Sequence, residues 1–519
     1  MKQWNGNLSR AGRQLQIICL LALACGSSAM AQGTESGSTT PPVQLPLKGR
    51  QVSEVGVQQS APASSGSGTR VQIQVQGRTA GSIPTTDHVA DVYELSLAEA
   101  VQRGLRANLG VVGSELSVQQ ARAQSAQARS VLLPNVAVSA SENAAKVNLA
   151  AEGFSASAFG AGPGLQFPTT VGPFHYYDLH GSLRQSLLDV TAIHNLRAQG
   201  RAEDAAILQG QQTREEVVLA VAGVYLQLMA DIALVDRQKA EVNLGSATYE
   251  QAKSQADAGN KAPIEANRSL VEYQTEQQRL RSQMGEVTKR QIQLARLIGL
   301  PLSTQIVPKE QLDILSSDGL SLQDAVKRAF SQRRDIKAAE SQLSAAEEAR
   351  KAASAERLPS AFLSGTYGLQ GTNPNHGTGV FQATASLNIP IFEGGRIEAD
   401  LTQADAVVRQ RRADLADQRG SVESEVRTAY VDLEVANDQV RLADSNRKLA
   451  SETLKQSQDR FAVGVADSVE VVTSQQALAT ADNDYVNSLF SQHVARIALA
   501  HAMGEAERQL PELFERKAQ

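Results

Sequence analysis

An internal duplication constrains this chain of 519 residues more than any other feature. Residues 95–103 match residues 320–328 at an offset of 225, and the same offset pairs Pro134 with Pro359. Further along, the offset is about 205 residues. The matched positions there are Tyr225 with Tyr430, Thr248 with Thr453, Gly259 with Gly464, Glu265 with Glu470, and Gly299 with Gly504. Solenoid repeats are only roughly 20 to 50 residues long, so this spacing predicts two copies of one domain.

The change of offset locates the difference between the two copies. About 20 extra residues fall between Pro134 and Ser182, so the first copy carries a longer loop. We assign residues 93–308 to the first repeat, residues 309–508 to the second and residues 509–519 to a C-terminal tail.

Each repeat is expected to run helix, strand, loop, strand, very long helix, turn, helix. Over residues 402–461, apolar side chains recur mostly at alternating spacings of three and four, the period of a coiled coil, although Arg411 and Gln418 interrupt the pattern. A helix over residues 395–463 would be about 100 Å long. The helices expected over 468–503 and 320–356 are each about half that length, so two of them end to end match one long helix.

The expected strands alternate apolar and polar side chains. Residues 177–184 and 381–389 do so clearly, and shorter, weaker versions follow Pro134 and Pro359. This alternation suits a membrane barrel with lipid on one face and water on the other, although a half-buried soluble sheet gives the same pattern. Because the smallest membrane barrels have about eight strands, four strands per chain require that several chains share one barrel.

The first 31 residues are expected to be a signal peptide. A basic start, an apolar stretch at 17–24 and small residues at 29–31 have the required order. Cleavage after Ala31 would remove both cysteines, Cys19 and Cys25. The competing interpretation is that Cys25 becomes a lipid-modified N-terminus. Either way the protein is exported.

Residues 32–92 are rich in Ser, Gly, Thr, Pro and Gln, so we expect a flexible leader with one short strand at 71–75. No segment after the signal has the roughly 18 consecutive apolar residues of a membrane helix.

Nothing in the sequence supports catalysis. It has no phosphate loop, no HExxH pair and no cysteine cluster, and its seven histidines are scattered. We therefore expect no enzyme activity, no cofactor and no metal. The mild net charge of -5 argues against nucleic acid as a partner.

Several motifs occur in order, and all but the one around Pro390 occur in both repeats. They are the opening Leu-Ser-Leu-x-x-Ala-Val at 95–101 and 320–326, the Leu-Pro at Pro134 and Pro359, the Asn-Ile-Pro-Ile-Phe-Glu-Gly-Gly around Pro390, and the glycine turns at 257–266 and 460–471. On these motifs, residues 93–508 resemble the TolC-like outer-membrane efflux protein family (outer membrane factors).

The resemblance implies a fold and a set of partners. The fold would be an α+β membrane protein, a homotrimer whose 12-stranded outer-membrane β-barrel continues into a 12-helix periplasmic α-barrel. Its partners would be outer-membrane lipid, a periplasmic adaptor and an inner-membrane pump.

The resemblance also implies roles for single residues. Gly259 and Gly464, with Val463 and Asp467, would form the periplasmic tip where the adaptor docks. Pro134, Pro359 and Pro390 would mark the junctions of strands and helices.

Glu265 and Glu470 would line the aperture at that tip, where crowded carboxylates attract cations. The alternative for Glu470 is a solvated carboxylate at a helix start. Phe461 and Ala466 stand where the family has a closing tyrosine and arginine, so the family's closing bonds cannot form here.

Two functions remain open at this point. The first is a passive duct for efflux or secretion, placed in the outer membrane and extending into the periplasm, with loop residues 141–174 outside the cell. The second is a periplasmic coiled-coil scaffold or adhesin without a pore.

Overall fold

The computed structural model describes residues 55–59, 71–75, 77–84, 92–149, 151, 168–259, 261–315, 319–373, 376–463, 465–466 and 468–509. The chain divides into two units, Met1–Lys48 and Gly49–Gln519, and every described residue belongs to the second. The expected signal peptide with Cys25, the turn residues Gly464 and Asp467, and the residues after Gln509 lie outside the described residues.

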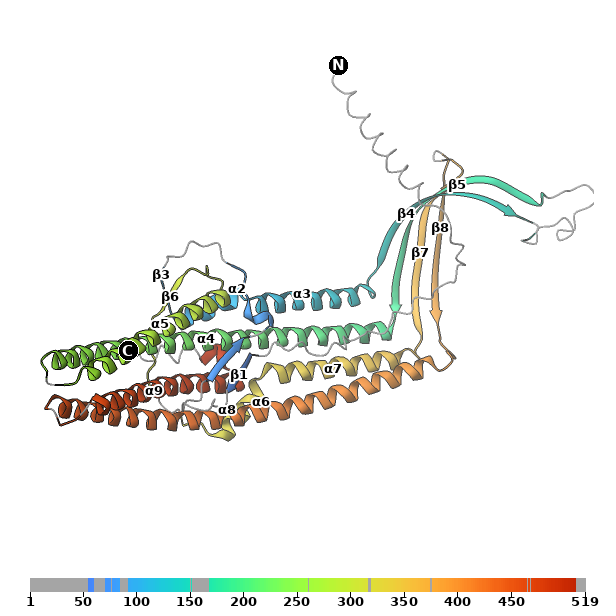
Figure 1. Ribbon diagram of the computed structural model, residues 1–519. Coiled ribbons are helices and arrows are strands. Elements are labelled where there is room, and N and C mark those ends of the chain that lie inside the picture. The colour runs from blue at the N-terminus through green and yellow to red at the C-terminus, as the bar shows by residue number, and fades with distance from the viewer. Residues whose placement is uncertain are drawn as a thin grey trace, which may run out of the picture. The chain divides into compact units, whose positions relative to one another are not determined.

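The two repeats have the same order of elements. The first contains α2 (Leu97–Ala107), α3 (Leu109–Ser130), β4 (Asn135–Asn148), β5 (Thr170–Leu188), α4 (Val190–Asp257) and α5 (Pro263–Ile298). The second contains α6 (Leu322–Gln332), α7 (Arg334–Ala355), β7 (Ser360–Gly371), β8 (Thr378–Asn388), α8 (Arg396–Ala462) and α9 (Ser468–Ala502). Figure 1 shows α3, α4, α7 and α8 side by side. The element order repeats as predicted, whereas the domain boundaries themselves stay predictions.

The expectation of one helix over residues 320–356 is wrong, because the helix breaks at Arg333. This residue has φ -56° and ψ 122°, which is not helical. Its buried guanidinium donates hydrogen bonds to Asp335 (2.7 Å), to Glu425 of α8 (2.8 Å) and to the carbonyl of Ala502 (3.2 Å). Together these bonds satisfy a buried charge, and the two long-range bonds, to Glu425 and Ala502, override the local helical pattern.

The first repeat breaks at the equivalent residue, Asn108, which is fully buried. Its Oδ1 accepts a hydrogen bond from the backbone N–H of Gly110 (2.8 Å) and so caps α3. Its Nδ2 donates to the carbonyl of Thr79 (2.8 Å), and Ser82 Oγ donates to the carbonyl of Arg296 (2.5 Å). Residues 77–84 fall inside the stretch expected as a flexible leader, yet they pack against the first repeat.

The long helix α8 buries one stripe of side chains. The residues of the stripe are Val408, Leu415, Val422, Val426, Ala429, Ala436, Val440, Ala443, Leu454 and Phe461. The predicted seam over 402–461 is therefore confirmed, and its partners are α7 and α9. A helix this long depends on tertiary packing of such a stripe.

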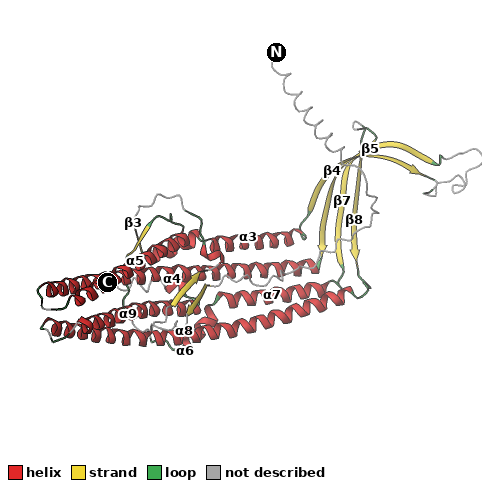
Figure 2. Ribbon diagram, in the orientation of Figure 1, coloured by secondary structure: helices red, strands yellow, loops and turns green. Residues whose placement is uncertain are grey.

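The four long strands form one antiparallel sheet in the order β4-β5-β7-β8 (Figure 2). The expectation that the strands after Pro134 and Pro359 are shorter than their partners is wrong for the second repeat, because β7 has 12 residues and β8 has 11. In the sequence of β7, Gly365 and Gly368 interrupt the alternation of apolar and polar side chains. A Cβ on Gly368 would lie 2.6 Å from the Cα of His180 on β5. The close approach of β5 to β7 therefore requires glycine at this position.

Short strands complete the helical part. β3 (Val92–Leu95) pairs in parallel with β6 (Gln305–Pro308), which joins the two ends of the first repeat. β2 (Val71–Val75) lies where a strand was predicted and pairs with β1 (Val55–Gln59). Gly77–Ala80 forms a 3-10 turn, η1.

The main core surrounds the middle of α4, where residues 217–226 are all buried. This helix is the one described helix that is long and apolar enough to cross a membrane, with a mean hydropathy of 2.0 in its most apolar window. Because 78% of that window is buried against other helices, the stretch has the properties of a core helix.

Candidate functional site

The two helical hairpins α4–α5 and α8–α9 each end in a turn at the end of the helices opposite the strands (Figure 1). In the first turn Gly259 has φ 75°, the left-handed region that glycine adopts without steric cost. Pro263 then starts α5, where the missing N–H costs no helical bond. The chain turns at Gly259, and the role of this turn in adaptor docking stays a prediction, whereas Gly464 and Asp467 lie outside the described residues.

Both predicted carboxylates lie in the first turns of the returning helices, Glu265 in α5 and Glu470 in α9. A helix N-terminus favours negative charge at that position. Each carboxylate also has an arginine beside it: Arg268 lies 3.1 Å from Glu265, and Arg460 lies 3.0 Å from Glu470. The sequence interpretation missed both arginines, although the spacing of three residues on one helix face could have revealed Arg268.

Phe461 is only 3% exposed and packs with Leu454 and Val471. Because phenylalanine lacks the hydroxyl of the family's tyrosine, the resemblance predicted that the family's closing bond cannot form at this position. Instead, the ammonium nitrogen of Lys261, in the first turn, lies 3.5 Å from the centroid of the Phe461 ring. Ala466 packs on the edge of the same cluster. The contact joins the turns of the two repeats.

Apolar side chains are exposed around the two turns. Val463 is 74% exposed and Val465 is 70% exposed. Ile264 and Val469, at the starts of the returning helices, are each at least half-exposed. Contiguous exposed apolar side chains are typical of surfaces that bind another protein.

Further from the turns, polar side chains link the hairpins. Gln475 of α9 donates to Thr248 Oγ1 of α4 (3.0 Å), and Gln476 donates to Glu272 of α5 (3.4 Å). The two hairpins are therefore held together at several levels along their length.

At the strand end of the helices, Pro134, Pro359 and Pro390 lie in the segments between helices and strands, as predicted. Within the described part of the chain, five ion pairs join α8 to α7 or to residues 356–357 just after it. They are Arg357–Glu398, Arg396–Glu356, Arg350–Asp405, Arg412–Glu347 and Arg419–Glu340.

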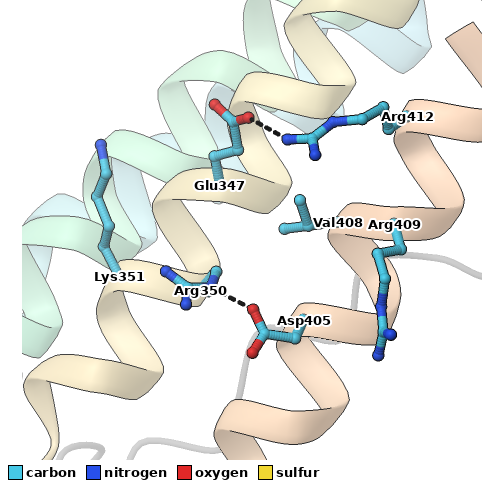
Figure 3. Close-up of a pocket in the computed structure, with 7 residues that line it drawn as sticks. All are labelled: Glu347, Arg350, Lys351, Asp405, Val408, Arg409 and Arg412. Carbon is cyan, nitrogen blue, oxygen red and sulfur yellow. Dashed lines mark hydrogen bonds and ion pairs between the residues drawn. The ribbon is translucent and has the colours of Figure 1, made fainter.

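A cavity of about 580 Å³ lies between α7 and α8, and Figure 3 shows the side chains that line it. Two of the cross-helix ion pairs, Arg350–Asp405 and Arg412–Glu347, lie in its wall with Arg409 and Lys351. Both carboxylates in this wall are thus occupied by arginines. Within the described residues, no group of three or more His, Cys, Asp or Glu side chains could hold a metal ion.

Comparisons with known proteins show which proteins this chain is similar to. Residues 325–505 match the model of the family described as Outer membrane efflux protein. The toluene efflux pump outer membrane protein TtgF of Pseudomonas putida is 26% identical over 432 residues, covering 79% of this chain and 83% of TtgF.

Solved structures share the fold. The outer-membrane channel OprN superposes with a TM-score of 0.69 at 17% identity, covering 79% of this chain and 90% of OprN. The outer membrane protein VceC of Vibrio cholerae superposes with a TM-score of 0.68 at 18% identity, covering 79% of this chain and 96% of VceC. The duplicated helices and strands, the family match and these relatives together lead to one conclusion: residues 325–505 match the outer membrane efflux protein family, and the chain is similar to TolC-like channels, which are located in the outer membrane and extend into the periplasm.

Proposed function

We propose that three copies of this chain form one export channel through the outer membrane, which a periplasmic adaptor and an inner-membrane pump supply with cargo. The observation that carries the proposal is the sheet β4-β5-β7-β8. Among the described strands, none pairs with the outer edges of β4 and β8. Three such sheets joined edge to edge would supply twelve strands, enough to close a barrel, which four cannot do.

The exposed side chains of the sheet support a place in lipid. On β4, Val138 is 76% exposed, and on β8, Phe381 is 81% exposed. Large apolar side chains on two edge strands would be a liability in water, where they invite aggregation. Facing lipid, they are stabilised by leaving water.

The helices support assembly independently. Besides its buried seam, α8 carries a second apolar stripe that is exposed in the single chain, formed by Val431, Val435, Leu442 and Leu449. These residues follow a heptad-like spacing, which is typical of a face that packs against another helix. A neighbouring copy would cover this stripe and close the helical tunnel.

The exposed valines Val463 and Val465 at the turn end support docking of the adaptor there. Because the proposed duct offers cargo only a passage, the choice of cargo would belong to the pump. The scaffold without a pore is the weaker function, because it gives no role to exposed apolar strands of membrane-spanning length.

The test is the assembly and conductance of the purified mature protein. We expect a trimer that needs detergent to stay in solution and that conducts ions in a planar lipid bilayer. A monodisperse monomer that is soluble without detergent would contradict both the trimer and the barrel. A detergent-free soluble trimer without conductance would favour the scaffold.

A further inference from the structure

Hydrogen bonds link three polar side chains on the neighbouring strands β4 and β5. The imidazole of His180 contacts the hydroxyl of Ser139 through Nε2 (2.9 Å) and the carboxylate of Asp178 through Nδ1 (2.8 Å). Because an ionised carboxylate only accepts hydrogen bonds, it favours the tautomer that carries its proton on Nδ1. The nitrogen Nε2 is then an acceptor, and the hydroxyl of Ser139 donates to it.

The register of the sheet brings these side chains together (Figure 1). Ser139 lies directly opposite His180, and Ser141 lies directly opposite Asp178. On the other side of β5, His180 lies opposite Gly368 of β7, where a Cβ would lie 2.6 Å from the Cβ of His180. Glycine at this position lets β7 pass beside the histidine without displacing it from its two polar partners.

The three side chains lie on the polar face of the sheet. Val138 and Leu179, their neighbours along the strands, point to the opposite face and are 76% and 48% exposed. In the proposed channel that apolar face contacts lipid, so the polar face lines the water-filled interior. Because Ser139 is exposed, a dissolved compound inside the barrel can reach its hydroxyl.

This arrangement is the one that activates a serine hydroxyl for attack on an electrophile. A free hydroxyl is a weak nucleophile, but an imidazole within hydrogen-bond distance can take its proton while the new bond forms. The carboxylate holds the ring in the correct tautomer and stabilises the imidazolium that results. Ser139, His180 and Asp178 have these three roles in the order that the chemistry requires.

The strands do not provide the donors that a hydrolase also needs. In the proposed barrel, β4 and β5 each have a partner strand on both sides, so their backbone N–H groups are engaged in sheet ladders. These two strands therefore offer no pair of free N–H groups to stabilise an oxyanion. A group that Ser139 takes up should remain attached and should not be turned over.

We propose that Ser139 is a covalent modification site inside the channel, which accepts a phosphorus or acyl group from activated esters. The oxygen of Ser139 bonds to the phosphorus or acyl carbon, and the bond to the leaving group breaks. The proton of the hydroxyl passes to Nε2 of His180 and from there to the leaving group. The location inside a channel rests on the proposed function, whereas the reactivity of Ser139 does not.

The test compares the rates at which an alkyl fluorophosphonate modifies two serines of the purified full-length mature protein in detergent. In this reaction an O–P bond forms, the P–F bond breaks, fluoride leaves and His180 takes the proton. Ser141 is the matched internal control, because it lies on the same face of β4 and its hydroxyl accepts a hydrogen bond from Asn143 (3.1 Å). We expect Ser139 to react about 10²- to 10⁴-fold faster, the usual contribution of a general base. Peptide mass spectrometry after timed incubations measures both rates.

Four variants assign the roles. Ser139→Ala should remove the fast adduct, and Ser141→Ala should leave its rate unchanged. His180→Ala should slow modification of Ser139 to the rate of Ser141, and added imidazole should restore part of the loss, which a merely structural histidine would not show. Asp178→Asn should also slow it, because the amide of asparagine can donate to Nδ1 and so favours the wrong tautomer.

Equal rates at Ser139 and Ser141, or a His180→Ala variant that reacts as fast as the unmodified protein, would overturn the modification site while leaving the channel intact. A loss in His180→Ala that imidazole does not restore would overturn the role of His180 as the base. An unmodified protein without conductance would overturn the channel and the location inside it, and the two rates would still decide whether Ser139 is activated.

Discussion

The hydroxyl of Tyr225 donates a hydrogen bond to the carbonyl of Leu95 (2.8 Å), and the duplication repeats this bond between Tyr430 and the carbonyl of Leu320 (3.2 Å). Both tyrosines come from the long helix of a repeat, and both carbonyls lie just before its first helix. The same polar bond therefore ties the start of each repeat to its long helix.

Removing this bond should destabilise the two repeats unequally. Tyr225 is fully buried, whereas Tyr430 is half-buried. Tyr225→Phe removes a buried hydroxyl that bonds both the Leu95 carbonyl, which keeps the N–H of Lys309 (3.1 Å), and the carboxylate of Glu310, and should cost about 1–3 kcal/mol. Tyr430→Phe should cost about 0.5–1.5 kcal/mol. Thermal unfolding of the detergent-solubilised protein, followed by circular dichroism, measures both. Equal losses of unfolding free energy in the two variants would show that burial of the tyrosine does not determine the size of the loss.

The ion pair of Arg333 and Glu425 should make stability sensitive to acid. Burial raises the pKa of Glu425, but the hydrogen bond from His501 and the charge of Arg333 outweigh it and lower the pKa to about 2. Because the ordinary value is 4.5, this carboxylate stabilises the fold above pH 4.5, and the contribution is lost as the pH falls toward 2. Glu425→Gln should cost about 1–2 kcal/mol at pH 7, since its side chain is still 40% exposed.

The difference between Glu425→Gln and the unmodified protein should vanish near pH 2. Glu423→Gln, an exposed neighbour on α8 that pairs with Arg427, is the control. A difference that persists unchanged at pH 2 would mean that the charge of Glu425 is not its source.

Glu241 should have the opposite dependence on pH. Burial raises its pKa to about 7, helped by the charges of Glu276 and Asp482. Between pH 4.5 and 7 the folded chain keeps a proton that the unfolded chain has released, so stability falls as the pH rises. Glu241→Gln should be more stable than the unmodified protein at pH 8 and equal to it near pH 4. Glu250→Gln, on the exposed side of the same helix, should show no such gain in the same unfolding measurement.

Two glycines with the same backbone angle should respond differently to alanine. Gly259 has φ 75° and open space where a Cβ would be added, whereas at Gly299, with φ 76°, a Cβ would lie 2.8 Å from the carbonyl oxygen of Ile83. Gly259→Ala should cost about 1–2 kcal/mol for the left-handed backbone alone. Gly299→Ala should cost about 1–3 kcal/mol more because of the clash. Similar unfolding temperatures for the two variants would show that residues 82–83 move aside.

The charge at the aperture should depend on Glu470 and its partner. Glu470→Lys should weaken or reverse a preference for cations, measured as the reversal potential in a salt gradient. Arg460→Met, which removes the arginine 3.0 Å from Glu470, should strengthen that preference. An unchanged reversal potential in Glu470→Lys would make this residue a solvated carboxylate at a helix start.

Local sequence patterns correctly predicted the structural features that depend on residues close together in the sequence. The seam of α8 and the glycine turn at Gly259 follow from spacing and backbone freedom, and the structure confirms both. The break at Arg333 could not be predicted, because it depends on Glu425, which lies 92 residues away. Lys261 escaped notice for the same reason, since its partner ring belongs to the other repeat.

The five ion pairs across the α7–α8 seam make one end of the protein responsive to salinity. Most of these side chains are at least one-third exposed, so dissolved ions reach and screen them. The Debye length shrinks from about 10 Å at 0.1 M salt to about 3 Å at 1 M, and pairs of this kind weaken with it. In brine the two helices should loosen along this seam, as should the exposed pair Arg460–Glu470 at the turns, whereas the apolar cluster around Phe461 should tighten or stay unchanged.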